Sequence, residues 1–596
     1  MKGNSEIKTY ELWGFRLFLA WCITAMLFML INTENDIFYI SYVTHVETKA
    51  FVFIFLLVVV VLTNANVLLK RWYTDVVLCL FVVPLYTTFM VINKASIYMC
   101  LAIFIFVFIL AGYTFKRFAK YTDNVKIGNL TSKVIVMMVL ILWMAYLMML
   151  TLIRYLSLKS PCYDFGIFSQ MYYYMKDCLI PYTTCERNML LSHLDVHMSP
   201  ILYILLPIYC IFPSPATILV SQVLLLAGAV VPLYLICKEK KLSNLFTTVI
   251  CVVYLLYPTM SGGLFYDFHE NKFLPLVIFW FIYFMEKRKL IPSVICMILV
   301  CGVKEDAAVY AGCVALYYIF AYKMKKEKVR AIIMFTFIML YFIFVVKYLG
   351  EMGDGAMTGR FGAFLANKDD SIFSMVVNII KNPTYFFANI MQEEKAEFLL
   401  WTMIPLCFVP VLGRKMVNYI LILPYLLLHF ITSYLYQYNI YYQYGYGSMS
   451  LLLFMVILYF AENDSGKKQH RRNVFLAFMM VFGVMITFTS SITAKHYYII
   501  NYTYEEEKSD LIRKTLEETI PEDASVEASS YFVVPLSDRH NIYQIGTKNR
   551  CEYVVYDLRI SGDQPKIEEY QKEKLADGYE IIQEIEGLVR ILKLKQ

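Results

Sequence analysis

The chain has 596 residues, of which 59% are hydrophobic and only 17% are charged, and this composition excludes a water-soluble globular protein. The net charge of +7 is unevenly placed: residues 1–501 carry +14 and residues 502–596 carry −7. The positive residues lie in short loops, which indicates membrane orientation and excludes nucleic-acid binding as their explanation.

Long apolar stretches without a charge, such as residues 51–69 and 134–153, can cross about 30 Å of hydrocarbon as helices. Basic loops such as Lys70-Arg71 and residues 467–472 mark the cytoplasmic side. We therefore predict an all-α polytopic protein of the cell (plasma) membrane with about fifteen transmembrane helices, a cytoplasmic N-terminus and an extracytoplasmic C-terminal segment. The predicted spans are residues 12–31, 51–69, 74–92, 97–115, 134–157, 216–237, 244–262, 273–285, 290–303, 307–322, 331–349, 397–413, 417–435, 447–461 and 473–492.

The chain divides into three predicted domains. Residues 1–132 form an N-terminal module of four transmembrane helices, and residues 133–501 form a transmembrane core. Residues 502–596 read as a small soluble α/β domain outside the membrane. Its predicted helices are residues 505–518 and 567–576, and its predicted strands are residues 532–534 and 553–556.

Two long outer loops interrupt the core, at residues 158–215 and at the glycine-containing residues 350–396. In the first, residues 200–212 are apolar but too short to span, so we predict a helix lying in the outer interface. Cys162, Cys178 and Cys185 share the same loop, so one disulfide is possible, but three cysteines do not define its pairing.

Polar residues gather in the loops that this topology places outside. Because charges at the mouth of a helical bundle are costly to desolvate, such clusters usually mark a site. The candidates, in chain order, are Asp164, His193, Asp195, His197, Asp267, His269, Glu270, Lys304, Glu305, Asp306, Arg360, Gln443, Tyr444 and Arg539.

Each cluster also has a purely structural interpretation. Asp164 suits a turn at the end of a span. His193, Asp195 and His197 are typical ligands of a divalent cation, but they also suit an ordinary interfacial loop. The run from Lys304 to Asp306 can neutralise itself at a helical hairpin, and the tyrosines of residues 436–446 can form an interfacial aromatic belt.

Four runs of sequence, YDFGIFSQ, HMSPILYILLPIYCIFPSP, YDFHEN and VKEDAAVY, resemble the domain-of-unknown-function family 2079 of bacterial membrane proteins. The tail segments SSYFVVPLSDRHNIYQI and EYVVYDLR resemble the C-terminal portion of the same family. The resemblance covers about residues 133–596 and leaves the first four spans outside it. The family is in turn similar to the C-type (GT-C) glycosyltransferase superfamily.

That resemblance implies transfer of a sugar from a polyprenyl-phosphate donor to an unknown envelope acceptor outside the cytoplasm. Asp164 matches the superfamily's essential aspartate, and His197 approximately matches its histidine motif. The chemistry then needs Asp164 as a base and a positive group, such as Lys304, Arg360 or Arg539, for the leaving phosphate. Gln443 and Tyr444 are predicted to contact substrate, and a divalent cation is a candidate cofactor.

Two other functions remain open. A lipid or glycolipid transporter would place charged residues along a path through the bilayer centre, whereas the predicted spans carry few charges at mid-membrane. A non-catalytic scaffold for envelope assembly is the other, because fold resemblance does not establish activity.

Overall fold

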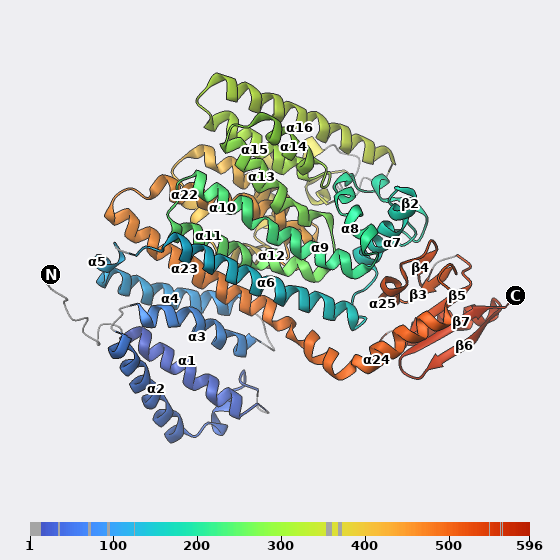
Figure 1. The fold of residues 1–596 in the computed structure, drawn as a ribbon, viewed down its shortest axis with the longest axis horizontal. Coiled ribbons are helices and arrows are strands. Elements are labelled where there is room, and N and C mark those ends of the chain that lie inside the picture. The colour runs from blue at the N-terminus through green and yellow to red at the C-terminus, as the bar shows by residue number, and fades with distance from the viewer. Residues whose placement is uncertain are drawn as a thin grey trace.

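The computed structural model describes residues 13–33, 36–69, 73–91, 96–123, 125–352, 360–367, 372–546, 549–560, 562 and 564–595. The predicted cytoplasmic residues Lys70 and Arg71, and three glycines of the loop at residues 350–396 (Gly353, Gly355 and Gly359), lie outside these ranges. The chain is a stack of apolar helices with a small sheet domain at one end (Figure 1).

The N-terminal helices pack against the last long helix of the bundle. Their bounds are α1 Trp13–Ile31, η2 Ile40–His45, α2 Thr48–Leu69, α3 Thr74–Val91, α4 Ile97–Arg117 and α5 Ala119–Thr122. Phe104 of α4 stacks on Phe482 of α23 (Lys467–Ile492), with ring centroids 6.3 Å apart, and Cys100 donates to Ser490 at 3.0 Å. A buried ion pair, Arg16 with Asp75 at 3.0 Å, joins α1 to α3 inside this module.

The central bundle begins with α6 and alternates long helices with short turns. Its helices are α6 Asn129–Leu156, α9 Pro215–Gly228, α10 Val230–Glu239, α11 Asn244–Leu256, α12 Pro258–Gly262, η5 Gly263–Tyr266, η6 Glu270–Phe273, α13 Leu274–Glu286, α14 Leu290–Cys301, α15 Ala307–Ala321, α16 Lys325–Met352, α20 Glu393–Met403, η8 Val409–Leu412, η9 Met416–Ile422, α21 Leu423–His429, η10 Leu435–Tyr438, η11 Gln443–Gly445, α22 Tyr446–Asn463 and α23. A large cluster of buried apolar side chains fills its interior, and α22 is buried along nearly its whole length.

Within the described ranges, nine helical segments are long and apolar enough to cross a membrane. The chain is therefore a multi-pass membrane protein, as the composition predicts. Each of the fifteen predicted spans overlaps a helix, but four of them are interrupted. Residues 216–237 break at Ala229, between α9 and α10, and residues 244–262 break at Tyr257, between α11 and α12. In residues 397–413, α20 ends at Met403, shortly before Pro405 and Pro410, because proline cannot continue an α-helix. Residues 417–435 form η9 and the seven-residue α21.

The segment after α6 carries the first group of candidate site residues. It contains α7 Tyr163–Cys178, β1 Tyr182–Thr183, β2 Leu191–Ser192, η3 His193–Asp195, η4 Pro200–Ile204 and α8 Leu206–Ile211. Residues 200–212 are helical, as predicted, with a break at Leu205 and an exposed apolar side that includes Ile208 and Ile211. The second loop contains η7 Gly362–Phe364, α18 Ile372–Lys381 and α19 Pro383–Ile390.

The C-terminal domain is a five-stranded mixed sheet in the order β4-β3-β5-β7-β6, with α24 leading into it (Figure 1). Its elements are η12 Thr493–His496, α24 Tyr497–Thr519, β3 Val526–Ala528, α25 Ser530–Val533, η13 Val534–Leu536, β4 Ile542–Gln544, β5 Tyr553–Asp557, α26 Gln564–Ala576, β6 Tyr579–Ile585 and β7 Val589–Leu594. The predicted domain boundary at residue 502 falls inside α24.

One strand prediction in this domain is wrong. Residues 532–534 are helical, in α25 and η13, and the strand lies earlier, at Val526–Ala528. A run of three apolar residues does not distinguish a strand from a buried helical turn. Since β3 and β4 are parallel, the chain needs a crossover connection between them, and α25 and η13 provide it.

The C-terminal domain docks directly on α7 (Figure 1). Gln170 of α7 donates to the carbonyls of Arg539 and His540, and the Tyr174 hydroxyl donates to the same His540 carbonyl at 2.8 Å. On the other side, Arg559 donates to the carbonyls of Ser157 and Leu158, just before α7. The domain therefore fixes the helix that carries Asp164.

Candidate functional site

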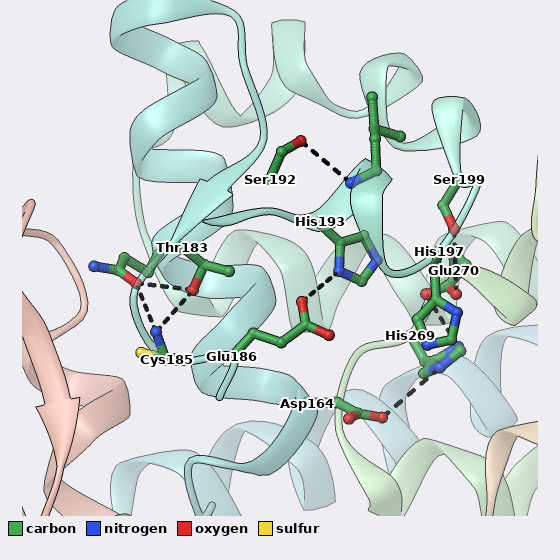
Figure 2. Close-up of polar contacts among 12 residues, drawn as sticks. Asp164, Thr183, Cys185, Glu186, Ser192, His193, His197, Ser199, His269 and Glu270 are labelled. Atoms are coloured by element: carbon green, nitrogen blue, oxygen red, sulfur yellow. Dashed lines mark hydrogen bonds and ion pairs between the residues drawn. The ribbon is translucent and has the colours of Figure 1, made fainter. Parts of the chain in front are cut away.

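Asp164 lies in the first turn of α7, where the N-terminal end of the helix favours a carboxylate. Phe165 and Phe168, in the same part of the helix, are buried and anchor it in the bundle. The Asp164 side chain keeps 28% of its surface exposed, whereas the His269 side chain that it faces is only 4% exposed (Figure 2). It is therefore held rigidly but stays accessible to a substrate.

Two side chains from other elements approach the Asp164 carboxylate. Its Oδ2 lies 3.7 Å from Nε2 of His269 (Figure 2). The same oxygen accepts a hydrogen bond from Nε2 of Gln443 at 3.4 Å. Burial raises the pKa of Asp164 to about 6; Lys304 opposes the rise and Glu270 adds to it. At neutral pH the group is ionised yet basic enough to take a proton.

His269 follows a strained turn at Asp267, whose φ is +69°. Its Nδ1 accepts the backbone N–H of Asn271 at 3.3 Å and lies 3.2 Å from Oε2 of Glu270. Its Nε2 faces both Asp164 Oδ2, at 3.7 Å, and Lys304 Nζ, at 3.4 Å. Burial, together with the positive charge of Lys304, holds the pKa of His269 well below its ordinary value. His269 is thus a neutral ring next to the carboxylate.

Lys304 and Glu270 form a buried ion pair behind His269. Lys304 Nζ lies 3.0 Å from Oε1 of Glu270, and the two side chains are 1% and 0% exposed. Lys304 Nζ also lies 3.4 Å from Nε2 of His269, and Ser199 donates to the same Glu270 oxygen at 3.4 Å. Burial lowers the pKa of Lys304, but Glu270 and Glu305 outweigh it and hold the pKa above its ordinary value. A permanent positive charge therefore lies close to Asp164.

His197 extends the network toward the hairpin between α14 and α15. Its Nδ1 lies 2.9 Å from Oε1 of Glu305, and although burial opposes the change, the contact with His197 and the charge of Lys304 lower the pKa of Glu305. The adjacent Asp306 has a raised pKa, first because it is buried and second because Glu305 is charged. The motif from Lys304 to Asp306 is therefore not a self-contained trio, since two of its members pair with other elements.

His193 pairs with Glu186, a residue that no motif marks. Nδ1 of His193 lies 3.1 Å from Oε2 of Glu186 (Figure 2). Although burial opposes both changes, the pair raises the pKa of His193 and lowers that of Glu186. The rings of His193 and His197 meet edge to face, with centroids 5.6 Å apart.

The histidines were predicted as possible ligands of a divalent cation together with Asp195. A carboxylate on Nδ1 is typical of metal-bound histidines, because it orients Nε2 toward the ion. Across the described part of the chain, however, no three His, Cys, Asp or Glu side chains converge as a metal site requires. The residues present do not fit a three-ligand site, so we derive no step through a metal.

Arg360 adds a second positive charge to the site and lies against two tyrosine rings. The Arg360 guanidinium lies over the rings of Tyr434 and Tyr444, at 5.0 and 5.1 Å from their centroids. It also affects the pKa values of Lys304 and Asp306, so it belongs to the same electrostatic cluster. Gln443, next to Tyr444, supplies the hydrogen bond to Asp164 described above.

Two predicted residues have structural partners instead. Asp267 accepts hydrogen bonds from Arg154 and from Ser160 (3.2 Å), and its carbonyl accepts from Lys272, which closes the turn before His269. The Arg539 guanidinium donates to the carbonyls of Leu536, Pro521 and Ala524 inside the C-terminal domain. Arg539 therefore does not join the cluster around Asp164.

Sequence reasoning missed Glu186, Ser199 and Lys272. Ser199 lies two residues after His197, and Lys272 two after Glu270, so proximity to a predicted motif was an available signal. Glu186 carried no such signal, because it approaches His193 only when β1 and β2 pair in the folded protein.

No curated protein matches the chain. Crystal structures of ArnT from Cupriavidus metallidurans, bound to undecaprenyl phosphate and in the apo state, align with 10% and 9% sequence identity and TM-scores of 0.43 and 0.38. Each alignment covers 76% of this chain and 97% of ArnT, but likeness at this level supports no inference about function. The sequence profile of the family described as predicted membrane protein (DUF2079) matches residues 154–590. The chain therefore belongs to the DUF2079 family of predicted membrane proteins.

Proposed function

We propose that this protein is a glycosyltransferase of the outer face of the cytoplasmic membrane, which transfers a sugar from a polyprenyl-phosphate donor to an envelope acceptor. The donor class comes from the sequence resemblance to the C-type glycosyltransferase superfamily. The observation that carries the proposal is the position of Asp164, a partly exposed carboxylate beside neutral His269 and the buried cation Lys304.

In this proposal Asp164 is the general base. It takes the proton of the acceptor hydroxyl as the oxygen attacks the anomeric carbon of the donor sugar, and the bond from that carbon to the phosphate oxygen breaks. A pKa of about 6 gives a carboxylate that is ionised at pH 7 and a better base than an ordinary aspartate. The N–H of Gln443 donates a hydrogen bond to the carboxylate, and the His269 ring lies against it.

The leaving polyprenyl phosphate needs positive charge. Lys304 forms an ion pair with Glu270 and contributes a fixed positive potential. Arg360 instead lies over tyrosine rings, and its described contacts include no carboxylate within ion-pair distance. Arg360 is therefore our candidate for direct contact with the phosphate, because a guanidinium can bind phosphate oxygens in a bidentate manner. The interfacial helices η4 and α8 offer a lipid-borne donor an apolar approach.

A lipid transporter is the main alternative, and one experiment separates the two functions. The purified protein is placed in liposomes with a radiolabelled polyprenyl-phosphate sugar and a detergent-free envelope extract as acceptor. A transferase releases free polyprenyl phosphate and labels the acceptor. A transporter moves the intact donor between leaflets without cleaving it, and that result contradicts the proposal. The proposal is also contradicted if the donor is neither cleaved nor moved.

A further inference from the structure

Two cysteines meet where α7, the loop after it and the C-terminal domain come together. Cys162 immediately precedes α7, and Cys185 follows β1. Both are buried, and both belong to an apolar cluster formed mainly by the C-terminal domain, with Phe532 and Val533 among its members. The neighbouring Cys162 thiol, together with burial, raises the pKa of the Cys185 thiol.

The backbone around Cys162 is fixed. Its N–H donates to the Ser530 hydroxyl at 3.0 Å, which ties it to the C-terminal domain. Gly166, one turn along α7, makes room for the sulfur, since a Cβ at Gly166 would lie only 2.8 Å from Cys162 Sγ. The thiol is therefore packed along its own helix, facing the domain interface.

The backbone around Cys185 is fixed to the same helix. Its N–H lies 3.3 Å from Oε1 of Gln170, and the neighbouring Thr184 N–H donates to the same oxygen at 2.7 Å. Because Gln170 is one turn beyond Gly166 on α7, both cysteines are held against one short stretch of that helix. Cys178, the third cysteine of the loop, lies 16 residues further along α7, or about 24 Å from Cys162.

We propose that Cys162 and Cys185 form a disulfide in the mature protein. The two thiols exchange with a protein or small-molecule disulfide of the envelope: the Cys162–Cys185 sulfur bond forms, and the oxidant is reduced to two thiols that take up the two protons. This chemistry needs an oxidising compartment, which is consistent with a loop outside the cytoplasm. The inference does not depend on the proposed glycosyl transfer.

The bond would connect two parts of the candidate site. Cys162 is two residues from Asp164, and Cys185 is adjacent to Glu186, the partner of His193. Oxidation would lock the first turn of α7 to the loop that carries Glu186, and reduction would free that loop to move.

Peptide mass spectrometry on the wild-type protein, denatured in excess alkylating reagent and digested with trypsin without reductant, tests the proposal. Cleavage after Lys159, Lys176 and Arg187 gives two peptides. Peptide 160–176 contains Cys162, and peptide 177–187 contains both Cys178 and Cys185. We expect these two peptides as one linked species that separates on reduction. Finding both peptides unlinked and alkylated at Cys162 and Cys185 would overturn the proposal.

The matched control is Cys178→Ser, because Cys178 is exposed and lies in the same peptide as Cys185. The linked species must persist in this variant and disappear in Cys185→Ser. Loss of the link in Cys178→Ser would assign the disulfide to Cys178 and overturn the pairing.

Discussion

Oδ2 of Asp164 lies 3.7 Å from Nε2 of His269, although 105 residues separate the two in the chain. The contact joins the first turn of α7 to the turn between η5 and η6, and it places a neutral ring between the carboxylate and Lys304. The buried cation therefore acts on Asp164 without forming an ion pair that would neutralise it.

Replacing Asp164 with Asn is expected to abolish transfer and leave the protein folded in the membrane. The amide has nearly the same shape but cannot accept the acceptor's proton, and loss of a general base typically costs on the order of a hundredfold or more in rate. Release of polyprenyl phosphate from a labelled lipid-linked sugar measures the change. Asp177→Asn, at an exposed position near the other end of α7, is the matched control and should keep full turnover. Near-normal turnover of Asp164→Asn would remove its role as base.

The rate of transfer should rise with pH through a single ionisation near pH 6. Burial raises the pKa of Asp164 to about 6, so the carboxyl is protonated and inactive as a base below that pH and ionised above it. The pH dependence of kcat/KM measures this ionisation. Because the pKa of Asp306 is also raised, Asp306→Asn is the control, and it should keep the same acid limb. If the fall in kcat/KM at acidic pH disappears in Asp306→Asn, the ionisation belongs to Asp306 and not to Asp164.

The sequence predicts the helices, the two long loops between them and most members of the cluster, because hydropathy and short motifs are local signals. The pairing of Asp164 with His269 and of His197 with Glu305 arises from packing between α7, η6 and the hairpin before α15, which no local pattern encodes. Arg539 shows the opposite error. Its neighbours in sequence resemble a family motif, but its charge is used by three carbonyls inside the C-terminal domain.

Breaking the buried pair between Lys304 and Glu270 should destabilise the protein by on the order of 3–5 kcal/mol, because each single change leaves an uncompensated charge in the interior. Lys304→Met and Glu270→Gln are measured by thermal unfolding in detergent, alone and together. The double variant should lose less stability than the two single losses combined. Lys514→Ala, which removes an exposed pair with Glu518, is the control and should change stability by less than about 1 kcal/mol. Additive losses would show that the two residues do not stabilise each other.

Chelation should leave turnover unchanged. His193 and His197 direct Nδ1 at Glu186 and Glu305, and no third ligand completes a site with them among the described residues. The measurement is polyprenyl phosphate release in EDTA, before and after a divalent cation is added back. Loss of activity in EDTA with recovery on adding the cation would instead support the cation site suggested by His193, Asp195 and His197. A variant such as Asp195→Asn should then weaken that recovery.

The C-terminal domain and the Asp164 loop are expected to lie together on the outer face of the membrane. They must share one side, because Arg513 of α24 donates to the carbonyl of Tyr155, and Ser530 accepts from Cys162. A cysteine at exposed Glu518 should react with an impermeant thiol reagent on intact cells, in a background in which the exposed Cys178 and Cys210 are replaced by Ser. A cysteine at exposed Lys326, in a basic loop that the positive-inside rule places in the cytoplasm, should react only after lysis. The reverse pattern would show that the topology is inverted and that Asp164 lies on the cytoplasmic side, which contradicts a reaction outside the cytoplasm.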